Sequence, residues 1–415
     1  MPKRSAPLDQ PFILWLSLAQ LITWGSVFYT FALLMEPVER ELGLTRAQSS
    51  VAFSLALLTE GFCAYPIGRM IDRGHERLVM TAGSVLVGAC LVLHGLIGSQ
   101  MQFYAVWAAL GLGMAATLYS PVFAIVTRRF PDEFRRGIII MTFLGGLAST
   151  VFIPLTAGLI ALLGWRHALW CLAALQLLVC LPLHAWLLRG APPAANQTQG
   201  AAQAGRSAAG PSLMPILTSA PFLLVGSFLV LMMGVTAALP AHMISLLREN
   251  GMRESLVIAI PASIGVLQVF GRALLYFFEK HFDVHMANRV IPCLLPLGLA
   301  ALLLVPVGAA LGTGLGAALV FVFVLLYGMG NGMNTIVKGT AIAQYVNRDH
   351  VASLNGALGV PMALARAAAP LMMGLLWSRE AGYSHGLLLL LVLSATGLGA
   401  FMAAQHITRP APGHA

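Results

Sequence analysis

Four ionisable side chains lie inside long apolar runs of the sequence, where they are the residues most able to do chemistry. They are Glu60, Arg272, Lys338 and Arg366. An ionisable group within a membrane span is energetically costly, and it normally faces a bundle interior or an aqueous cavity. Three positive charges against one negative charge predict a cavity of positive potential. Because a guanidinium can bind both oxygens of a carboxylate at once, this set predicts a binding site for a small organic anion.

Polar residues near these charges extend the predicted site. Asn331 and Asn334 precede Lys338 by seven and four residues, a spacing that places all three on one face of a helix. Arg272 and Lys338 each lie near the end of an apolar run, so snorkelling of their head groups to the membrane surface is the alternative. Two aromatic residues complete the candidate set, although such residues pack more often than they bind: Tyr29 and Tyr119.

Glu60 and Arg366 lie near the middle of their apolar runs, and we expect them to form an ion pair if the two runs are neighbours, as the resemblance carried by residues 68–77 implies. Such a pair would allow both charges to be buried at a similar depth. It could act as a gate that breaks in one conformation, or Glu60 could take up a proton when Arg366 releases it. A static pair is the alternative, since a buried pair is by itself weak evidence for stability.

The element that must position these side chains is the membrane-spanning helix. Hydrophobic residues make up 58% of the 415 positions and charged residues only 9%, whereas a soluble domain carries about 25% charged residues. About 20 apolar residues cross a hydrocarbon core about 30 Å thick. The runs are too long and continuous for the alternating strands of a barrel. We therefore predict an all-α polytopic membrane protein with twelve spans, at 12–35, 48–71, 78–98, 102–127, 137–162, 167–188, 219–246, 255–278, 288–310, 315–343, 353–378 and 385–406.

The distribution of basic residues predicts the orientation of the spans. With both termini in the cytoplasm, about fifteen Lys and Arg residues fall on the cytoplasmic side and six on the other, as the positive-inside rule requires. The segment 189–218 is rich in Ala, Gly, Gln, Ser and Pro, a composition typical of a flexible linker. We expect a bacterial-type inner-membrane protein with two six-helix bundles, 1–188 and 219–415, joined by this cytoplasmic linker.

The two halves of the chain resemble each other. The stretch 154–159, PLTAGL, recurs as PLMMGL at 370–375, and 111–113, GLG, recurs as GMG at 328–330. The pair Gly68-Arg69 recurs as Gly271-Arg272 in the corresponding run. A duplicated six-helix unit predicts a binding site between the halves that is exposed alternately to each side of the membrane.

The stretch 68–77, which reads GRMIDRGHER, resembles the signature Gly-x-x-x-Asp-Arg-x-Gly-x-Arg of the major facilitator superfamily. Its second glycine, Gly74, falls one residue early. The resemblance covers nearly the whole chain and implies the fold of that family. Within the stretch, Gly68 is expected to permit close helix approach, Asp72 to accept hydrogen bonds from a facing helix terminus, and Arg73 and Arg77 to form a latch that breaks during transport. A merely basic turn is the alternative.

Shorter stretches resemble the monocarboxylate and oxalate carrier branches of that superfamily: 24–29, 41–48, 269–273, 355–357 and 369–370. In those relatives the matching arginine of the eighth span meets the substrate carboxylate, which implies this role for Arg272. The monocarboxylate relatives place an aspartate one turn earlier, where this chain has Gln268. The lysine of the oxalate carrier has no basic counterpart near 361–363, which disfavours oxalate itself.

Other features exclude whole classes of function. No Walker loop, zinc-binding helix motif or nucleophile elbow occurs, so we expect neither an enzyme nor a cofactor or metal site. The net charge of +9 resides in loops between spans, which indicates topology and no nucleic acid. The expected partners are the anion, protons if transport is coupled to them, and the lipid bilayer, with the protein acting as a monomer.

Three alternatives and two local interpretations remain from the sequence. Coupling could be proton symport, which Glu60 favours, or anion exchange. A drug or toxicant exporter of the same fold is a second possibility, and a transporter-like receptor without turnover is a third.

Four arginines between the fourth and fifth spans are interpreted as anchors at anionic headgroups: Arg128, Arg129, Arg135 and Arg136. Three histidines are interpreted as satisfied by local contacts or near interfaces: His94, His167 and His242.

Overall fold

A computed structural model of the chain describes residues 9–130, 133–190, 214–278, 284–311, 314–347 and 351–408. The regular elements among these residues are helices joined by short turns, and the one pair of bridged residues described is Ser378 with Gly382. Twelve of the described helices are long and apolar enough to cross a membrane. The predicted fold class, an all-α polytopic membrane protein with twelve spans, is therefore confirmed. Most of the expected linker lies outside the described residues.

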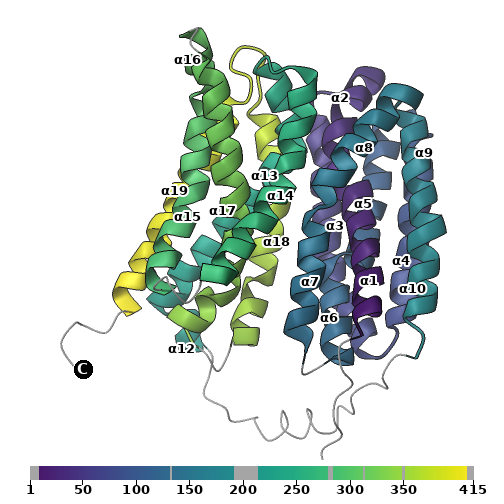
Figure 1. The fold of residues 1–415 in the computed structure, drawn as a ribbon, viewed down its shortest axis with the longest axis horizontal. Helices are drawn as coiled ribbons and strands as arrows, with labels where there is room; N and C mark the ends of the chain where they lie inside the picture. The colour runs from purple at the N-terminus through teal and green to yellow at the C-terminus, as the bar shows by residue number, and fades with distance from the viewer. Residues whose placement is uncertain are drawn as a thin grey trace, which may run out of the picture. The chain divides into compact units, whose positions relative to one another are not determined.

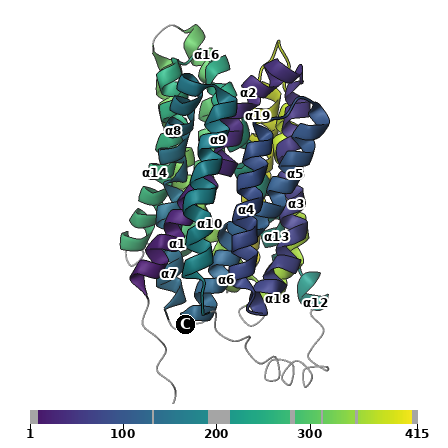
Figure 2. The same ribbon diagram turned by 90° about the vertical axis from the view of Figure 1, so that its right-hand side faces the viewer.

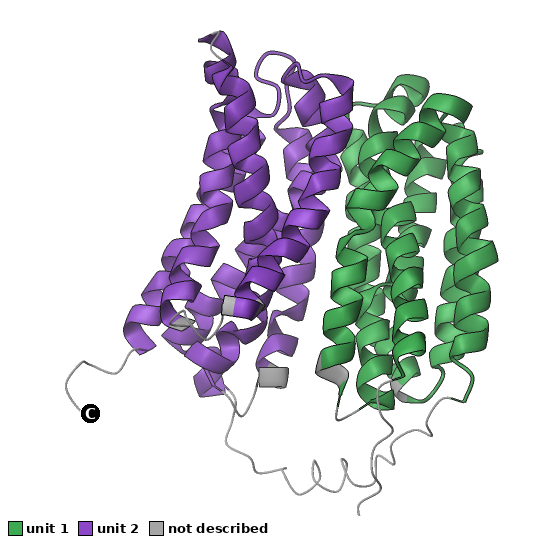
Figure 3. Ribbon diagram, viewed as in Figure 1, with its two compact units in different colours: residues 1–211 green, residues 212–415 purple. Residues whose placement is uncertain are grey.

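The chain divides into two compact units, Met1–Pro211 (unit 1) and Ser212–Ala415 (unit 2) (Figure 3). Each unit contains six of the twelve candidate spans. The helices of unit 1 are α1 Gln10–Thr23, η1 Trp24–Tyr29, α2 Thr30–Leu42, α3 Arg46–Asp72, α4 Glu76–His94, α5 Gln100–Thr117, α6 Tyr119–Arg129, α7 Phe134–Gly146, α8 Ala148–Leu163, α9 Trp165–Leu175, η2 Gln176–Cys180 and α10 Leu181–Leu187. Those of unit 2 are α12 Met214–Leu217, α13 Ala220–Glu249, α14 Glu254–Phe278, α15 Val284–Leu303, α16 Val305–Ala310, α17 Leu315–Tyr345, α18 Val351–Leu375 and α19 Ser384–Thr408.

The same pattern of helix pairing occurs in both units. In unit 1, α3 and α4 pack on α5, α1 packs on α7, and α4 packs on α9. In unit 2 the corresponding spans pair in the same way, with α14 and α15 on α17, α13 on α18, and α15 on α19. Figures 1 and 2 show α4 alongside α9 and α10, and Figure 1 shows α15 between α17 and α19. The internal repeat seen in the sequence is thus a repeat of packing.

Local sequence signals explain where several helices begin and end. Thr45 starts α3 with a capping box, in which its hydroxyl accepts from the Gln48 backbone N–H at 3.2 Å and the Gln48 side chain accepts from the Thr45 backbone N–H at 2.8 Å. The first span was predicted to end at 35, but α2 continues to Leu42. It stops only where Gly43 takes a positive φ of 65°, because glycine tolerates the left-handed conformation.

Aromatic and aliphatic side chains fill the interior of each unit. In unit 1 a cluster that includes Phe12, Leu16, Met80 and Ile125 joins α1, α4 and α6. In unit 2 the rings of Phe228 and Phe401 stack with their centroids 4.3 Å apart and join α13 to α19. These apolar interiors fix the helix positions from which the charged residues project.

Candidate functional site

The three positive residues predicted for the site all lie in unit 2, one on each of three helices. Arg272 lies on α14, Lys338 on α17 and Arg366 on α18, and each side chain is half-buried. Helices α14 and α18 both pack on α17, which carries Lys338. Neither α17 nor α18 contains an acidic residue, and the acidic residue of α14 is its first, Glu254. The fold therefore gathers the three residues into a region of positive charge.

Close packing of α14 on α17 positions Arg272. A Cβ atom added to Gly332 would overlap the backbone of Gln268, and one added to Gly271 would lie 2.8 Å from the Met329 carbonyl oxygen. Only glycine allows the two backbones to approach this closely. The Nε of Arg272 donates to the carbonyl oxygen of Gly332 at 3.4 Å. Gly271, which matched Gly68 in the first half of the sequence, and Gly332, which was not part of any match, therefore hold the arginine against α17.

The polar residues of α17 lie on one helical face, as their spacing predicted. Asn331 and Lys338 are half-buried, and Asn334 between them is fully buried. Neither the amide oxygen nor the amide nitrogen of Asn334 has a hydrogen-bond partner among the described residues. A buried polar group without a partner costs about 1–3 kcal/mol. Asn334 can therefore accept and donate hydrogen bonds to a polar group that reaches this face.

Tyr29 and Tyr119 belong to a continuous series of aromatic rings in unit 1. Tyr119 lies 5.0 Å from Trp24, Trp24 lies 5.1 Å from Phe28, and Phe28 lies 5.3 Å from Tyr29, measured between ring centroids. Trp24, Phe28 and Tyr29 fall in η1, a π-helical segment, and such segments occur frequently at functional sites. Both tyrosines are half-buried and make ring contacts. Their binding role stays a prediction.

Glu60 is half-buried in α3 of unit 1, whereas Arg366 belongs to unit 2. The proposed ion pair would join the two units and stays a prediction.

The stretch 68–77 has a different geometry from the one expected. A Cβ atom added to Gly68 would meet nothing within 4 Å, so the expectation that this glycine permits close helix approach is wrong. Gly74 instead requires glycine, because its φ is 88°. The backbone N–H of Gly74 donates to Ile71 at 2.8 Å, and that of His75 donates to Met70 at 3.0 Å. These bonds end α3 in a Schellman-type turn.

The arginines of the expected latch occupy separate positions. Arg73 is exposed and follows the last residue of α3. Arg77 crosses to α10, where its Nε donates to the carbonyl oxygen of Ala185 at 2.7 Å. The side chain of Asp72 lies outside the described part of the structure. A latch that includes these residues stays a prediction.

The sequence did not identify Glu76, the buried acidic residue of the same stretch. Its side chain is fully buried, and Arg129 donates to one of its oxygens through Nε at 2.8 Å and through a terminal nitrogen at 2.5 Å. Arg128 lies 3.6 Å from the other oxygen and also donates to the carbonyl of Ile71. The interpretation of Arg128 and Arg129 as headgroup anchors is therefore wrong. The sequence signal that could have identified the pair was an acidic residue at the start of one span and two basic residues at the end of the next span.

A family model described as the Major Facilitator Superfamily matches residues 16–370 of the chain. The chain belongs to the Major Facilitator Superfamily. An uncharacterised transporter of this type from Bacillus subtilis (strain 168), YcxA, is 22% identical over 196 residues. That match covers 47% of this chain, which thus spans about half (48%) of the length of that curated relative.

Solved structures of two transporters share the fold of this chain. A bacterial homologue of the human lysosomal transporter Spinster, in an inward-facing and occupied conformation, matches with a TM-score of 0.72 at 16% identity and covers 99% of this chain and 100% of its own. The nucleoside transporter NupG matches with a TM-score of 0.67 at 14% identity and covers 95% and 99%. At these identities the similarity concerns the fold. The family and the fold indicate a multi-pass membrane transporter and not an enzyme.

The histidines of this superfamily member have unequal surroundings. His167 of α9 is exposed and contacts the carbonyl oxygen of Leu163, the last residue of α8, whereas His242 is bonded at both ring nitrogens. His94 is fully buried, and among the described residues neither ring nitrogen has a hydrogen-bond partner. Its expected local hydrogen bonds are therefore not formed, and aromatic rings surround it, with Trp107 at 5.7 Å. Within the described ranges no cluster of His, Cys, Asp and Glu could hold a metal ion.

Proposed function

We propose that this member of the superfamily is a secondary active transporter for a small organic anion, a mono- or dicarboxylate. The observation that carries the proposal is the positive region of unit 2, formed by Arg272, Lys338 and Arg366 on three helices of which two pack on the third. An anion reduces the mutual repulsion of these charges when it binds. The resemblance to the monocarboxylate and oxalate branches supports the same substrate class.

Each residue of the region has a distinct role in this proposal. Arg272 binds the carboxylate with two parallel hydrogen bonds, because its fork of donors matches the two oxygens. Lys338 supplies a positive charge on a flexible stem beside the buried amide of Asn334. Asn331 extends the polar face of α17, and the two tyrosines Tyr29 and Tyr119 supply aromatic surface. The site is exposed alternately to the two sides of the membrane.

The location, the coupling and the gate are further parts of the proposal. The basic residues between the spans support an inner membrane with both termini in the cytoplasm and segment 189–218 as the linker of two bundles. Glu60 with Arg366 forms a gate that breaks in one conformation, or Glu60 takes up the coupled proton when Arg366 releases it. Asp72, Arg73 and Arg77 form a latch that opens and closes with the transport cycle. We propose a monomer as the functional form.

A thermal-shift screen of the purified protein against organic acids tests the substrate class. A ligand that binds only the folded state at 100 times its Kd stabilises that state by about 2.7 kcal/mol. We expect a di- or monocarboxylate to raise the melting temperature, and Arg272→Ala to abolish the shift. Arg136→Ala is the control, because Arg136 is exposed. A shift that persists unchanged in Arg272→Ala would remove Arg272 from the site.

Flux into proteoliposomes tests turnover. A transporter accumulates the anion that stabilises it, in response to a gradient of protons or of a second anion. Binding without accumulation would contradict the proposed transport and favour a receptor.

A further inference from the structure

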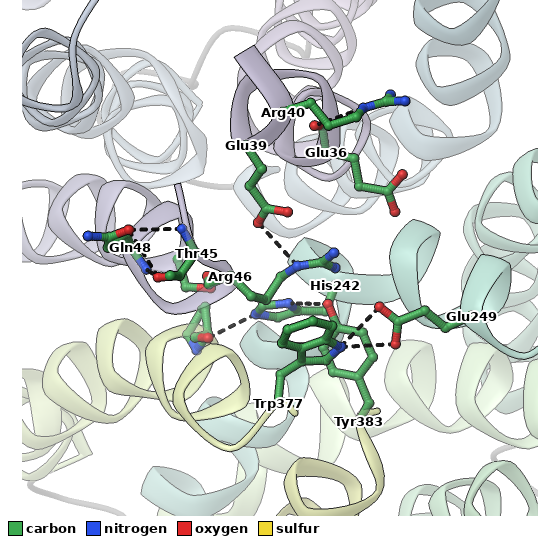
Figure 4. Close-up of polar contacts among 12 residues, drawn as sticks. Glu36, Glu39, Arg40, Thr45, Arg46, Gln48, His242, Glu249, Trp377 and Tyr383 are labelled. Carbon is green, nitrogen blue, oxygen red and sulfur yellow. Dashed lines mark hydrogen bonds and ion pairs between the residues drawn. The ribbon is translucent and has the colours of Figure 1, made fainter. Parts of the chain in front are cut away.

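His242 of α13 connects three parts of unit 2 through its two ring nitrogens. The ring is fully buried. Its Nδ1 lies 3.1 Å from the hydroxyl oxygen of Tyr383, in the segment between α18 and α19, and its Nε2 lies 2.9 Å from the carbonyl oxygen of Pro370 in α18. Figure 4 shows the contact between His242 and Tyr383. The sequence analysis interpreted His242 as satisfied by local contacts. Its two bonds instead connect α13 with α18 and with the segment between α18 and α19.

The partners determine the protonation state in which both bonds are satisfied. The carbonyl oxygen of Pro370 can only accept, so Nε2 carries a proton and donates it. In the neutral ring, Nδ1 then accepts from the Tyr383 hydroxyl. A second proton would turn Nδ1 into a donor, and the Tyr383 hydroxyl would have to turn its own proton away. The added charge would also lie in a fully buried position, which is unfavourable without a charged partner.

The position of Pro370 connects this ring to the proposed anion site. Proline has no N–H, so Pro370 cannot donate the helical hydrogen bond to the carbonyl of Arg366, one turn earlier in α18. The helix is therefore more deformable at this turn. Helix α18, which carries Arg366, packs on α17, which carries Lys338. A displacement of Pro370 would therefore alter the position of Arg366 within the positive region.

A second contact ties the same segment to the same face of α13. Glu249 follows His242 by seven residues, which is two helical turns, and the indole N–H of Trp377 lies 3.0 Å from each of its carboxylate oxygens. Figure 4 shows both contacts side by side. Within the segment, Ser378 and Gly382 form a bridge. Trp377 also attaches the segment between α18 and α19 to α13. Loss of the contact between His242 and Tyr383 would therefore leave this second attachment in place.

The elements packed against α13 are α12, which has no titratable side chain, α14, α17, α18 and α19. Tyr383 contacts the ring of His242 directly. The other described titratable and charged side chains of these elements, of α13 itself and of the intervening segment are Arg248, Glu249, Glu254, Arg272, Tyr327, Lys338, Tyr345, Arg366, Arg379, Glu380, His385 and His406.

We propose that His242 is a proton-binding positioning residue for Arg366. The neutral ring ties the turn at Pro370 to α13 and accepts from Tyr383. Proton uptake reverses the bond to Tyr383 and places an uncompensated charge in a fully buried position, and relief of that cost displaces the turn at Pro370 and with it Arg366. This role rests on the proposed anion transport. It supplies a protonatable group within unit 2, independent of Glu60 in unit 1.

His242→Gln tests the proposal, because a glutamine amide can donate to Pro370 and accept from Tyr383 but does not titrate near neutral pH. Two measurements are made on the full-length protein between about pH 5 and 8, the range in which histidine titrates: the melting temperature, and anion uptake in proteoliposomes. We expect the melting temperature to depend on pH in the wild type through the ring of His242 and to lose that contribution in His242→Gln. Uptake in His242→Gln should keep only the pH dependence that Glu60 supplies. The control His167→Gln should follow the wild type, because His167 is exposed.

Tyr383→Phe provides a test that retains the ring. Without the hydroxyl donor, the neutral form loses one hydrogen bond worth about 1 kcal/mol, so the midpoint of the pH profile should move up by about 0.5–1 unit. A wild-type dependence of the melting temperature on pH in His242→Gln would overturn the proposal. If His242→Gln does not fold, an unmoved midpoint in Tyr383→Phe would overturn it. The melting curves need no substrate. If no anion binds, the proposed transport fails while the titration of His242 is still measured.

Discussion

The guanidinium of Arg129 donates two hydrogen bonds to one carboxylate oxygen of Glu76, at 2.8 and 2.5 Å, across 53 residues of sequence. The bonds join the first turn of α4 to the last turn of α6. Arg128 lies against the second carboxylate oxygen. Two cations thus converge on one fully buried carboxylate, and the beginning of one span is fixed to the end of another.

Glu76→Gln tests how much this contact contributes to stability. Removing one partner of a buried ion pair leaves buried charge without compensation and costs about 3–5 kcal/mol. We expect a marked fall in the melting temperature of the purified protein. Glu133→Gln is the matched control, because Glu133 and Arg136 are 40% and 66% exposed and lie 3.9 Å apart. An equal melting temperature for Glu76→Gln and the wild type would show that the contact is not maintained in solution.

The two glycines of the 68–77 stretch should respond oppositely to substitution by alanine. Gly74→Ala places a side chain on a backbone with φ of 88°, which costs about 1–2 kcal/mol. Gly68→Ala meets nothing within 4 Å in helix α3, and alanine favours helix by up to about 1 kcal/mol. We therefore expect a lower melting temperature for Gly74→Ala and an equal or higher one for Gly68→Ala. A lower melting temperature for Gly68→Ala than for Gly74→Ala would show that Gly68 lies in close helix packing after all.

Gly332→Ala should separate α14 from α17. The added Cβ overlaps the backbone of Gln268, and overpacking of this kind typically costs about 1–3 kcal/mol. Because Arg272 bonds to the Gly332 carbonyl, we also expect weaker anion binding in a titration at fixed pH. Gly339→Ala, in the same helix, is the control, since its Cβ would meet nothing within 4 Å. Unchanged affinity in Gly332→Ala would mean that this approach does not position Arg272.

The proposed pair of Glu60 and Arg366 can be tested by exchanging its charges. We expect Glu60→Arg and Arg366→Glu each to abolish uptake and to lower the free energy of unfolding. The double variant should recover the free energy of unfolding, with a coupling energy of about 0.5–3 kcal/mol in a double-mutant cycle. Additive losses would rule out the pair. Its role with protons is measured separately. If Glu60→Gln leaves the pH dependence of uptake unchanged, Glu60 does not carry the coupled proton.

Much of the fold follows from the sequence because a membrane span is a local property. A run of about 20 apolar residues is sufficient to predict a spanning helix, so all twelve spans were predictable. One predicted span that the structure divides into two helices shows where prediction from the sequence stops. The predicted 288–310 span is divided between α15 and α16 at Leu304, because Pro306 lies at the start of a new helix, where proline is tolerated.

By itself the sequence determined the membrane class, the internal repeat and the presence of Arg272, Lys338 and Arg366 within spans. The face that each side chain occupies, and the groups it meets, depended on packing between helices far apart in sequence. The tertiary structure alone decided that Glu76 is the buried partner of Arg129, that Gly332 and not Gly68 permits close helix approach, and that His242 joins Tyr383 to Pro370. Residue type and spacing define which contacts are chemically possible, whereas only the packed bundle defines which of them form.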